Sequence, residues 1–202
     1  MNTDKISPKQ KQLIVNILSR KIHPHPRIWT TLFINPFFHK RGKGSKVCSK
    51  ARMDVFPWHK FELGSGAIIE DYAVVNNGAG DVFIGEKSRI GIGSVLVGPV
   101  KIGDRTSLGP HVHIAGFNHT FDEGDRDWNE QGLTKKEITV GKECLIGANA
   151  VVVAGVNIGD NVQIGAGSVV TKDIPSLSVA VGNPAKVIKR YNCESRQWEK
   201  VK

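Results

Sequence analysis

Three histidines, His111, His113 and His119, stand close together near the middle of the 202-residue chain. A neutral imidazole has an ordinary pKa of about 6.5 and can draw a proton from a hydroxyl group near neutral pH, which makes that hydroxyl a nucleophile. His119 opens a polar, acidic and irregular segment, where a side chain can project from the edge of a rigid element. His119 is therefore a candidate general base, although its position alone favours an ordinary histidine of a surface loop.

A second chemistry is open to the same three histidines. His111 and His113 flank Val112, and alternate residues of a strand face the same side, so both imidazoles are expected to point outward together. With His119 they could form a zinc site, for which neutral imidazole is the right kind of ligand. A zinc site is therefore the alternative to a metal-free general base.

A six-residue repeat defines the element that must position these side chains. Ile, Leu or Val occupies every sixth position in two unbroken runs: Ile84, Ile90, Leu96, Ile102, Leu108 and Ile114, then Val140, Ile146, Val152, Ile158, Ile164 and Val170. This step matches neither the helical spacing of about 3.6 residues nor the alternation of about 2 in a plain strand. It suits a short strand followed by a turn. Three such sides close one triangular coil of a parallel β-helix, with the aliphatic side chains inside.

Glycine adds a longer period to the pattern. Eight of the twelve aliphatic residues are followed by glycine, which we expect to permit a corner backbone that other residues resist. The exceptions are Val97, Ala115, Val153 and Thr171, which fall at the third and sixth step of each run. Because three steps make one coil, these residues are predicted to share one corner of the β-helix.

The pattern predicts one all-β domain with additions at both ends. Residues 61–175 are expected to form a parallel β-helix of about five coils, from which a long loop (115–139) is extruded. Residues 1–60 are expected to form a basic cap with a short helix from Ser7 to Lys21, since the open end of a repeat stack needs covering. Residues 176–202 are expected to form a C-terminal tail that could end in a short helix.

The positive charge is concentrated in the N-terminal cap. The net charge is +9, and residues 1–60 hold 13 Lys and Arg residues against Asp4 and Asp54. Such a segment could contact an anionic membrane surface or an anionic glycan, whereas nucleic acid is not expected because no reader motif accompanies the charge. The apolar stretch 28–38 is too short to span a bilayer and could lie at its interface, but packing against the first coil is the expectation.

Cysteine usage and the N-terminus indicate a cytoplasmic protein. Cys48, Cys144 and Cys193 are odd in number and widely spaced, which favours reduced thiols over a disulfide framework. The N-terminus is polar and charged, so we expect no cleavable signal.

Several segments together resemble the hexapeptide-repeat acyltransferases, particularly the branch of galactoside, maltose, nodulation and polysaccharide O-acetyltransferases. The resemblance spans roughly residues 54–190. It is carried by the repeat runs, by Asn118-His119, by Ile146-Gly147-Ala148-Asn149-Ala150, by Thr171-Lys172-Asp173-Ile174-Pro175 and by Gly182-Asn183-Pro184-Ala185-Lys186.

The resemblance implies a left-handed β-helix, assembled as a homotrimer with active sites between subunits. It also implies acetyl-CoA as the donor, no metal, and His119 as the catalytic base. The residues that the resemblance assigns to the coenzyme are Ala148, Ala166, Thr171, Lys172, Lys186 and Lys189. The lysine ammonium groups would suit its phosphates.

The acceptor side departs from the family pattern at two positions. The acceptor-contacting asparagine of the galactoside branch corresponds to Gly91, and the usual tryptophan before Ile146 is Leu145. Other residues must then contact the acceptor. The candidates are Asn76, Asn77, Asn118, Asp54, Asp122 and Trp128, the first two only if their irregular corner faces a neighbouring subunit.

The sequence thus favours an acetyl-CoA-dependent O-acetyltransferase that transfers directly to a hydroxyl of a sugar or glycan precursor. The alternatives are a zinc-dependent hydratase, resembling the carbonic anhydrases of the same fold, and a non-catalytic trimeric scaffold. N-acetylation of an amino sugar is also open, because the same base serves an amine.

Overall fold

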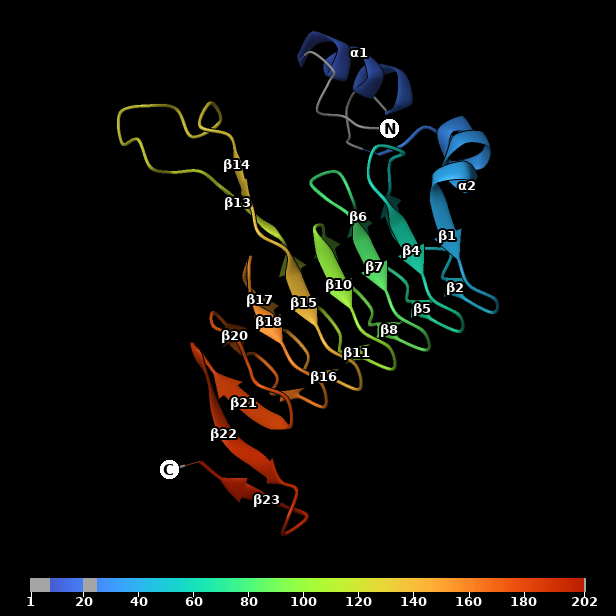
Figure 1. Ribbon diagram of the computed structural model, residues 1–202. Coiled ribbons are helices and arrows are strands. Elements are labelled where there is room, and N and C mark those ends of the chain that lie inside the picture. The colour runs from blue at the N-terminus through green and yellow to red at the C-terminus, as the bar shows by residue number, and fades with distance from the viewer. Residues whose placement is uncertain (1–7, 20–24, 202) are drawn as a thin grey trace.

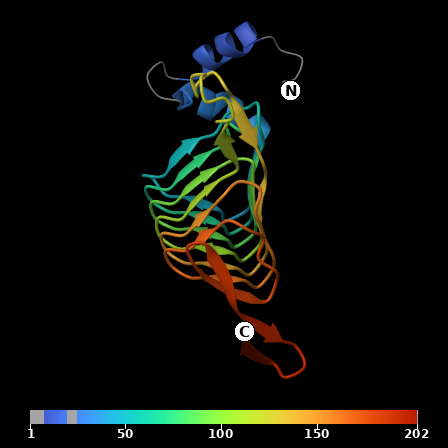
Figure 2. The ribbon, with the colours of Figure 1, turned by 90° about the vertical axis from the view of Figure 1, so that its left-hand side faces the viewer.

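The computed structural model describes residues 8–19 and 25–201. The body of the protein is a left-handed parallel β-helix (Figure 1). Three long sheets run along the stack. Short helices lie at its N-terminal end, and antiparallel strands extend the C-terminal end (Figures 1 and 2). The predicted fold class is confirmed.

Each coil contributes one short strand to each of the three sheets. The first sheet contains β1 (His39–Arg41), β4 (Phe61–Leu63), β7 (Val82–Ile84), β10 (Val100–Ile102), β15 (Ile138–Val140) and β18 (Asn157–Ile158). The second contains β2 (Lys46–Val47), β5 (Ile68–Ile69), β8 (Arg89–Ile90), β11 (Ser107–Leu108), β16 (Leu145–Ile146), β19 (Gln163–Ile164), β21 (Ser178–Gly182), β22 (Ala185–Asn192) and β23 (Gln197–Lys200). The third contains β3 (Arg52–Asp54), β6 (Val74–Asn76), β9 (Val95–Val97), β12 (His113–Ala115), β17 (Val151–Val152) and β20 (Val169–Val170).

The stack has six coils, and the additional one precedes the predicted start. Strands β1, β2 and β3 pair in parallel with β4, β5 and β6, so residues 39–54 belong to the β-helix and not to the cap. The residues of this coil that pair with the inward Leu63, Ile69 and Val75 are Arg41, Val47 and Met53, of which Arg41 is exposed. Because an end coil is covered on one side only, it does not need the aliphatic repeat by which the others are recognised.

The predicted interior residues form the core. All twelve repeat aliphatics are buried, none more than 3% exposed. The four glycine exceptions also share one corner, since Val97 pairs with Ala115 and the strands before Val153 and Thr171 continue the same sheet in register. The 18-residue period of the sequence is therefore one coil of the structure.

The repeat glycines serve a purpose other than the expected one. Gly85 has no left-handed backbone, but a Cβ atom there would lie 2.5 Å from the backbone nitrogen of Asp104 on the next coil. Left-handed φ angles occur two residues later, at Lys87 (55°) and Arg105 (54°). These glycines are required because adjacent coils approach too closely for a side chain.

The N-terminal helices are α1 (Pro8–Leu18), the π-helical turn η2 (Thr30–Ile34) and α2 (Asn35–Phe38). The predicted helix ends, Ser7 and Lys21, lie outside the described residues. Among the described residues, no helix has the length and apolarity needed to cross a bilayer. The expected packing of residues 28–38 against the first coil is wrong for most of their apolar side chains, which are exposed.

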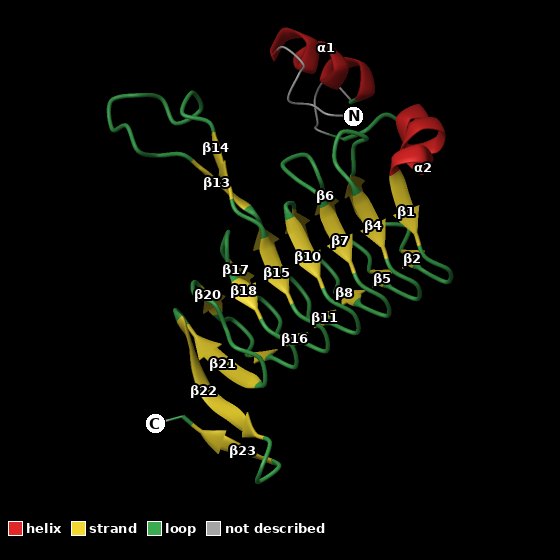
Figure 3. Ribbon diagram, viewed as in Figure 1, coloured by secondary structure: helices red, strands yellow, loops and turns green. Residues whose placement is uncertain are grey.

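Two segments leave the regular stack. The extruded loop forms a hairpin of β13 (Phe117–His119) and β14 (Leu133–Lys135), which projects from the body (Figure 3). At the C-terminus, β21 adds to the second sheet in parallel, and β22 and β23 follow in antiparallel order. The tail is therefore a sheet extension, and the short helix that it could have ended in does not occur up to residue 201.

Candidate active site

One corner of the β-helix gathers several of the sequence-predicted site residues. Four strands of the third sheet end in register at Asp54, Asn76, Val97 and Ala115, and Val153 and Thr171 directly follow β17 and β20 at the same corner. We call this column the third corner. The hairpin with His119 leaves the stack directly after Ala115, and Thr171 lies two coils further along. At about 4.8 Å per coil, that separation is roughly 10 Å along the stack.

His119 is exposed and lies between two aromatic rings at the end of β13. Its ring meets Trp128 edge-on at a centroid distance of 5.0 Å and Phe117 at 6.1 Å. The structure therefore brings Trp128, predicted from the sequence as a pocket residue, to the candidate base. Asn118 alternates with His119 along the strand, so its side chain faces the opposite side of the hairpin.

The loop beyond the hairpin is tied together by Gln131, which sequence reasoning missed. Its side-chain oxygen accepts hydrogen bonds from the backbone N–H groups of Asp122 and Glu123, at 2.9 and 3.1 Å. Its amide nitrogen donates to the carbonyls of Glu123 and Arg126, both at 2.8 Å. These bonds shape the loop that presents Trp128 to His119. Asp122 itself is exposed in this loop.

A second histidine, His59, lies at the third corner without any signal in the sequence. Its Nδ1 atom is 3.5 Å from Asp81 Oδ1, which also accepts a hydrogen bond from the backbone N–H of Lys60. Burial lowers the pKa of His59, the nearby Lys135 ammonium lowers it further, and Asp81 acts in the opposite direction. His59 is therefore held as a neutral imidazole.

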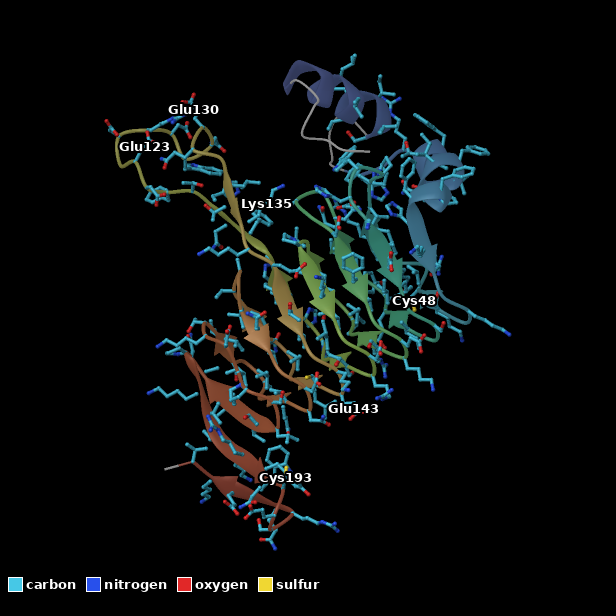
Figure 4. All side chains as sticks on the ribbon, viewed as in Figure 1. Cys48, Glu123, Glu130, Lys135, Glu143 and Cys193 are labelled. Atoms are coloured by element: carbon cyan, nitrogen blue, oxygen red, sulfur yellow. The ribbon has the colours of Figure 1, made fainter. Side chains whose placement is uncertain are left out.

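Lys135 connects this histidine to the hairpin. On β14, Lys135 lies opposite Phe117 and Leu133 lies opposite His119, so these side chains share one face of the hairpin. Figure 4 shows Lys135 nearer the base of the hairpin, with Glu123 and Glu130 at its tip. The residue of the hairpin that acts on His59 is therefore on the same face as His119. His59 and Lys135 are far apart in sequence, and the stacking of the coils places them within electrostatic range of each other.

The predicted coenzyme residues fall into three groups. Ala148 and Ala166 lie on adjacent coils between the second and third sheets, where the Gly167 N–H donates to the Ala148 carbonyl at 2.8 Å. Thr171 and Lys172 are exposed at the opposite edge of the third sheet, by which we mean the side where its strands end, whereas Ala148 and Ala166 lie on the side where they begin. Lys186 and Lys189 lie on β22, beyond the last coil, opposite Val181 and Val179. One protomer does not bring all six residues to one place.

Two predicted acceptor residues have structural roles. Asn77 is fully buried, its Nδ2 atom donating to the carbonyls of Phe56 and His59 and its Oδ1 atom accepting from the Phe56 N–H. Asp54 is buried as well, with its oxygens 2.7 Å from His25 Nδ1 and 2.8 Å from Arg52 Nε. The Asp54 carboxylate and the Asn77 amide are thus both engaged by partners within the protein. Both residues instead hold the irregular first turns of the third corner.

The remaining acceptor positions differ in accessibility. Asn76 is half-buried and its Oδ1 atom accepts a hydrogen bond from the Gly78 N–H at 2.6 Å. Gly91 cannot carry the asparagine of the galactoside branch, because a Cβ atom there would lie 2.5 Å from the Leu108 carbonyl oxygen. Leu145 is exposed on β16.

The alternative zinc site gains no support from the geometry. His111 and His113 are both exposed on the coil surface. The described part of the chain contains no group of three or more His, Cys, Asp or Glu side chains placed to hold a metal ion.

The three cysteines are unpaired thiols, and burial raises the pKa of Cys144.

Comparison with protein families matches the two coils on either side of the hairpin. The profile of the bacterial transferase hexapeptide (six repeats) matches residues 81–116, and that of the hexapeptide repeat of succinyl-transferase matches residues 137–172.

Curated proteins with similar sequences include two from Escherichia coli K12. A galactoside O-acetyltransferase is 39% identical over 99 residues, which cover 49% of this chain and 48% of that protein. WbbJ, assigned as a lipopolysaccharide biosynthesis O-acetyl transferase, is 32% identical over 133 residues, which cover 61% of this chain and 68% of that protein. The chain thus spans about half the length of the first relative and two thirds of the second.

Among solved structures, the N-acyltransferase AntD from Bacillus cereus, in complex with dTDP-4-amino-4,6-dideoxyglucose and coenzyme A, superposes with a TM-score of 0.68. It is 21% identical, and the match covers 82% of this chain and 91% of that one. This likeness shows the shared fold. The two family profiles, together with the similarity to WbbJ over most of that protein, show that the chain belongs to the hexapeptide-repeat acyltransferases.

Proposed function

We propose that this protein is an acetyl-CoA-dependent O-acetyltransferase that modifies a hydroxyl of a sugar or glycan precursor. The observation that carries the proposal is the hairpin, which leaves the third corner and presents His119 beside Trp128. Membership of the acyltransferase family and sequence similarity to two O-acetyltransferases support the reaction class.

The reaction requires a single base and no covalent enzyme intermediate. The imidazole of His119 takes the proton of the acceptor hydroxyl while the oxygen attacks the thioester carbonyl of acetyl-CoA. The carbon–sulfur bond then breaks, and the leaving thiolate takes the proton back from the imidazolium. The products are an O-acetyl ester and coenzyme A. Trp128 offers an apolar face against which a sugar ring can pack.

The donor would lie in a groove between two protomers of a homotrimer. Ala148 and Ala166 lie at one edge of the third sheet, whereas Thr171, Lys172 and the His119 hairpin lie at the other. A groove between neighbouring stacks would join these two edges. We place the protein in the cytoplasm, where its unpaired thiols remain reduced.

The test follows thiol release from acetyl-CoA with a panel of sugars and nucleotide sugars. We expect His119→Ala to lower kcat/KM by about 10²- to 10⁴-fold, the usual effect of removing a general base. His113→Ala is the matched control, since this histidine is also exposed but lies on the stack. It should retain activity within a few-fold.

Equal activity of His119→Ala and the wild type would overturn the assigned base. Stoichiometric zinc by elemental analysis, lost on His113→Ala, would favour the hydratase instead. No acetyl-CoA binding by calorimetry would favour a scaffold without catalysis.

A further inference from the structure

The segment from Ile28 to Phe38 buries two polar residues and exposes most of its apolar ones. Its buried side chains are those of Thr30 and Asn35. Exposed fractions reach 84% for Phe37, 69% for Phe33 and 66% for Ile28, and Leu32 and Phe38 are exposed as well. A monomeric soluble surface rarely gathers so many large apolar side chains in one short segment.

Specific hydrogen bonds hold the segment in this inverted orientation. The Thr30 hydroxyl donates to the Leu18 carbonyl at 3.0 Å, which joins η2 to the end of α1. The Asn35 amide donates to the Val55 carbonyl at 2.8 Å, which joins α2 to the stack. Because these buried bonds would be lost on rotation of the segment, its apolar face stays directed away from the protein.

Helix α1 adds to the exposed apolar surface at the same end of the molecule. Leu13 and Ile17 are four residues apart and therefore lie on one face of the helix, and both are exposed. Figures 1 and 2 both show α1 and α2 together, remote from β23 at the opposite end. We call the exposed residues Leu13, Ile17, Ile28, Leu32, Phe33, Phe37 and Phe38 the apolar end face.

The segment of the sequence that carries the apolar end face is rich in positive charge. Between residues 5 and 60 the only acidic residue is Asp54, which is buried between His25 and Arg52. Exposed cations follow the face directly, at Lys40, Arg41, Lys43 and Lys46. Lys40 contacts Glu62 at 3.2 Å. Exposed apolar side chains, joined to a first coil rich in exposed cations, match a surface with an apolar interior and anionic groups above it.

We propose that the apolar end face docks onto the surface of an anionic lipid bilayer. Phe33, Phe37 and Ile28 would enter the boundary between headgroups and acyl chains, and the lysines would contact lipid phosphates. The protein would lie on the membrane and not span it, in keeping with the shortness of its helices. The proposal does not depend on the transferase reaction.

The test is flotation of the full chain with vesicles of phosphatidylethanolamine and phosphatidylglycerol, compared with vesicles of phosphatidylcholine alone. We expect binding to the anionic vesicles that weakens as salt is raised. Joint replacement of Phe33→Ser and Phe37→Ser should lower the binding constant by about tenfold or more, since each phenyl group loses its burial in lipid. Lys43→Gln with Lys46→Gln should lower it by about fivefold per lysine.

Matched variants separate docking from misfolding and from catalysis. Trp198→Ser removes an exposed aromatic side chain from β23 and should leave binding unchanged. His119→Ala should float as the wild type does, because the hairpin is not part of the face. Thermal melts by circular dichroism should be the same for the phenylalanine variant and the wild type, as both side chains are exposed.

Two results would overturn the proposal. One is equal flotation of the phenylalanine variant and the wild type. The other is a wild type that ignores vesicles while the phenylalanine variant changes the oligomeric mass by light scattering, which would make the face a contact between copies of this chain.

Discussion

Burial lowers the pKa of His39 to about 4. Its ring meets Phe61 edge-on at 5.9 Å, and neither ring nitrogen has a hydrogen-bond partner among the described residues. The folded protein therefore keeps this imidazole neutral, whereas the unfolded chain protonates it below about pH 6.5. Between about pH 4 and 6.5 the unfolded state binds more protons, so stability falls as the pH falls through this window.

Replacing His39→Phe should flatten this part of the pH dependence of stability. After allowance for partial exposure of the ring, we expect the loss of unfolding free energy between pH 7 and about pH 4.5 to shrink by roughly 1–2 kcal/mol. Urea unfolding of both proteins across this range measures the difference. The exposed-site control His111→Gln should keep the wild-type slope, and an unchanged slope for His39→Phe would contradict the assignment.

Asn77 is the second residue whose role can be tested by stability. Asn77→Ala removes three hydrogen bonds to the turn at Phe56 and His59 and leaves buried backbone groups unpaired. We expect a loss of about 2–4 kcal/mol in urea unfolding. Asn76→Ala is the matched control, because it removes one bond at a half-buried site and should cost about 1 kcal/mol. Lost activity with unchanged stability would instead support the substrate role expected for Asn77.

At the scale of elements, the hairpin is an addition to a stack that closes without it. Strand β15 pairs with β10 and strand β12 pairs with β9, so the coils continue in register on both sides of the insertion. Two hydrogen bonds close the stack where the hairpin begins and ends. The Gly116 N–H donates to the Val97 carbonyl, and the Lys136 N–H donates to the Gly116 carbonyl. The fold and the proposed chemistry would therefore be carried by separate elements.

Replacing residues 117–135 by a short Gly-Ser linker should leave the melting temperature within a few degrees of the wild type and abolish acetyl transfer. The reason is that the buried core lies wholly in the coils, while His119 and Trp128 lie in the hairpin. Calorimetry and the thiol-release assay measure the two effects. A variant that melts far lower, or that keeps its activity, would show that the two functions are not separable in this way.

At the scale of the whole molecule, the proposed site residues lie at the two edges of the third sheet, which predicts an active site shared between two protomers. If His119 comes from one protomer and Ala166 from its neighbour, neither edge can act alone. Light scattering should give three times the mass of the chain for the wild type, as expected for a closed trimer.

Mixed trimers provide the sharper measurement. His119→Ala and Ala166→Trp should each be inactive, and co-expression of the two chains should restore part of the activity, because some grooves then combine two intact edges. Mixing the separately purified, stable trimers is the control and should restore nothing. No recovery from co-expressed, co-purified chains would place both residues in one protomer's site.

The sequence alone determined the five coils with the aliphatic repeat, the residues whose side chains point into the core, and the third corner. Each of these follows from a local period: an inward side chain every sixth residue and a corner every eighteenth. The extruded loop that carries His119 could also be predicted, because the repeat stops at Ile114 and resumes at Val140, but its two hairpin strands could not.

Only the tertiary structure decided what depends on neighbours far away in sequence. The coil at residues 39–54 has no aliphatic repeat and is recognised by its pairing with the next coil. Asn77 became a buried anchor and His59 a neighbour of Lys135 because stacking joins residues from separate turns. The sequence showed that residues 28–38 are apolar but gave the wrong orientation for them, because the buried bonds of Thr30 and Asn35 decide which side of the segment meets solvent.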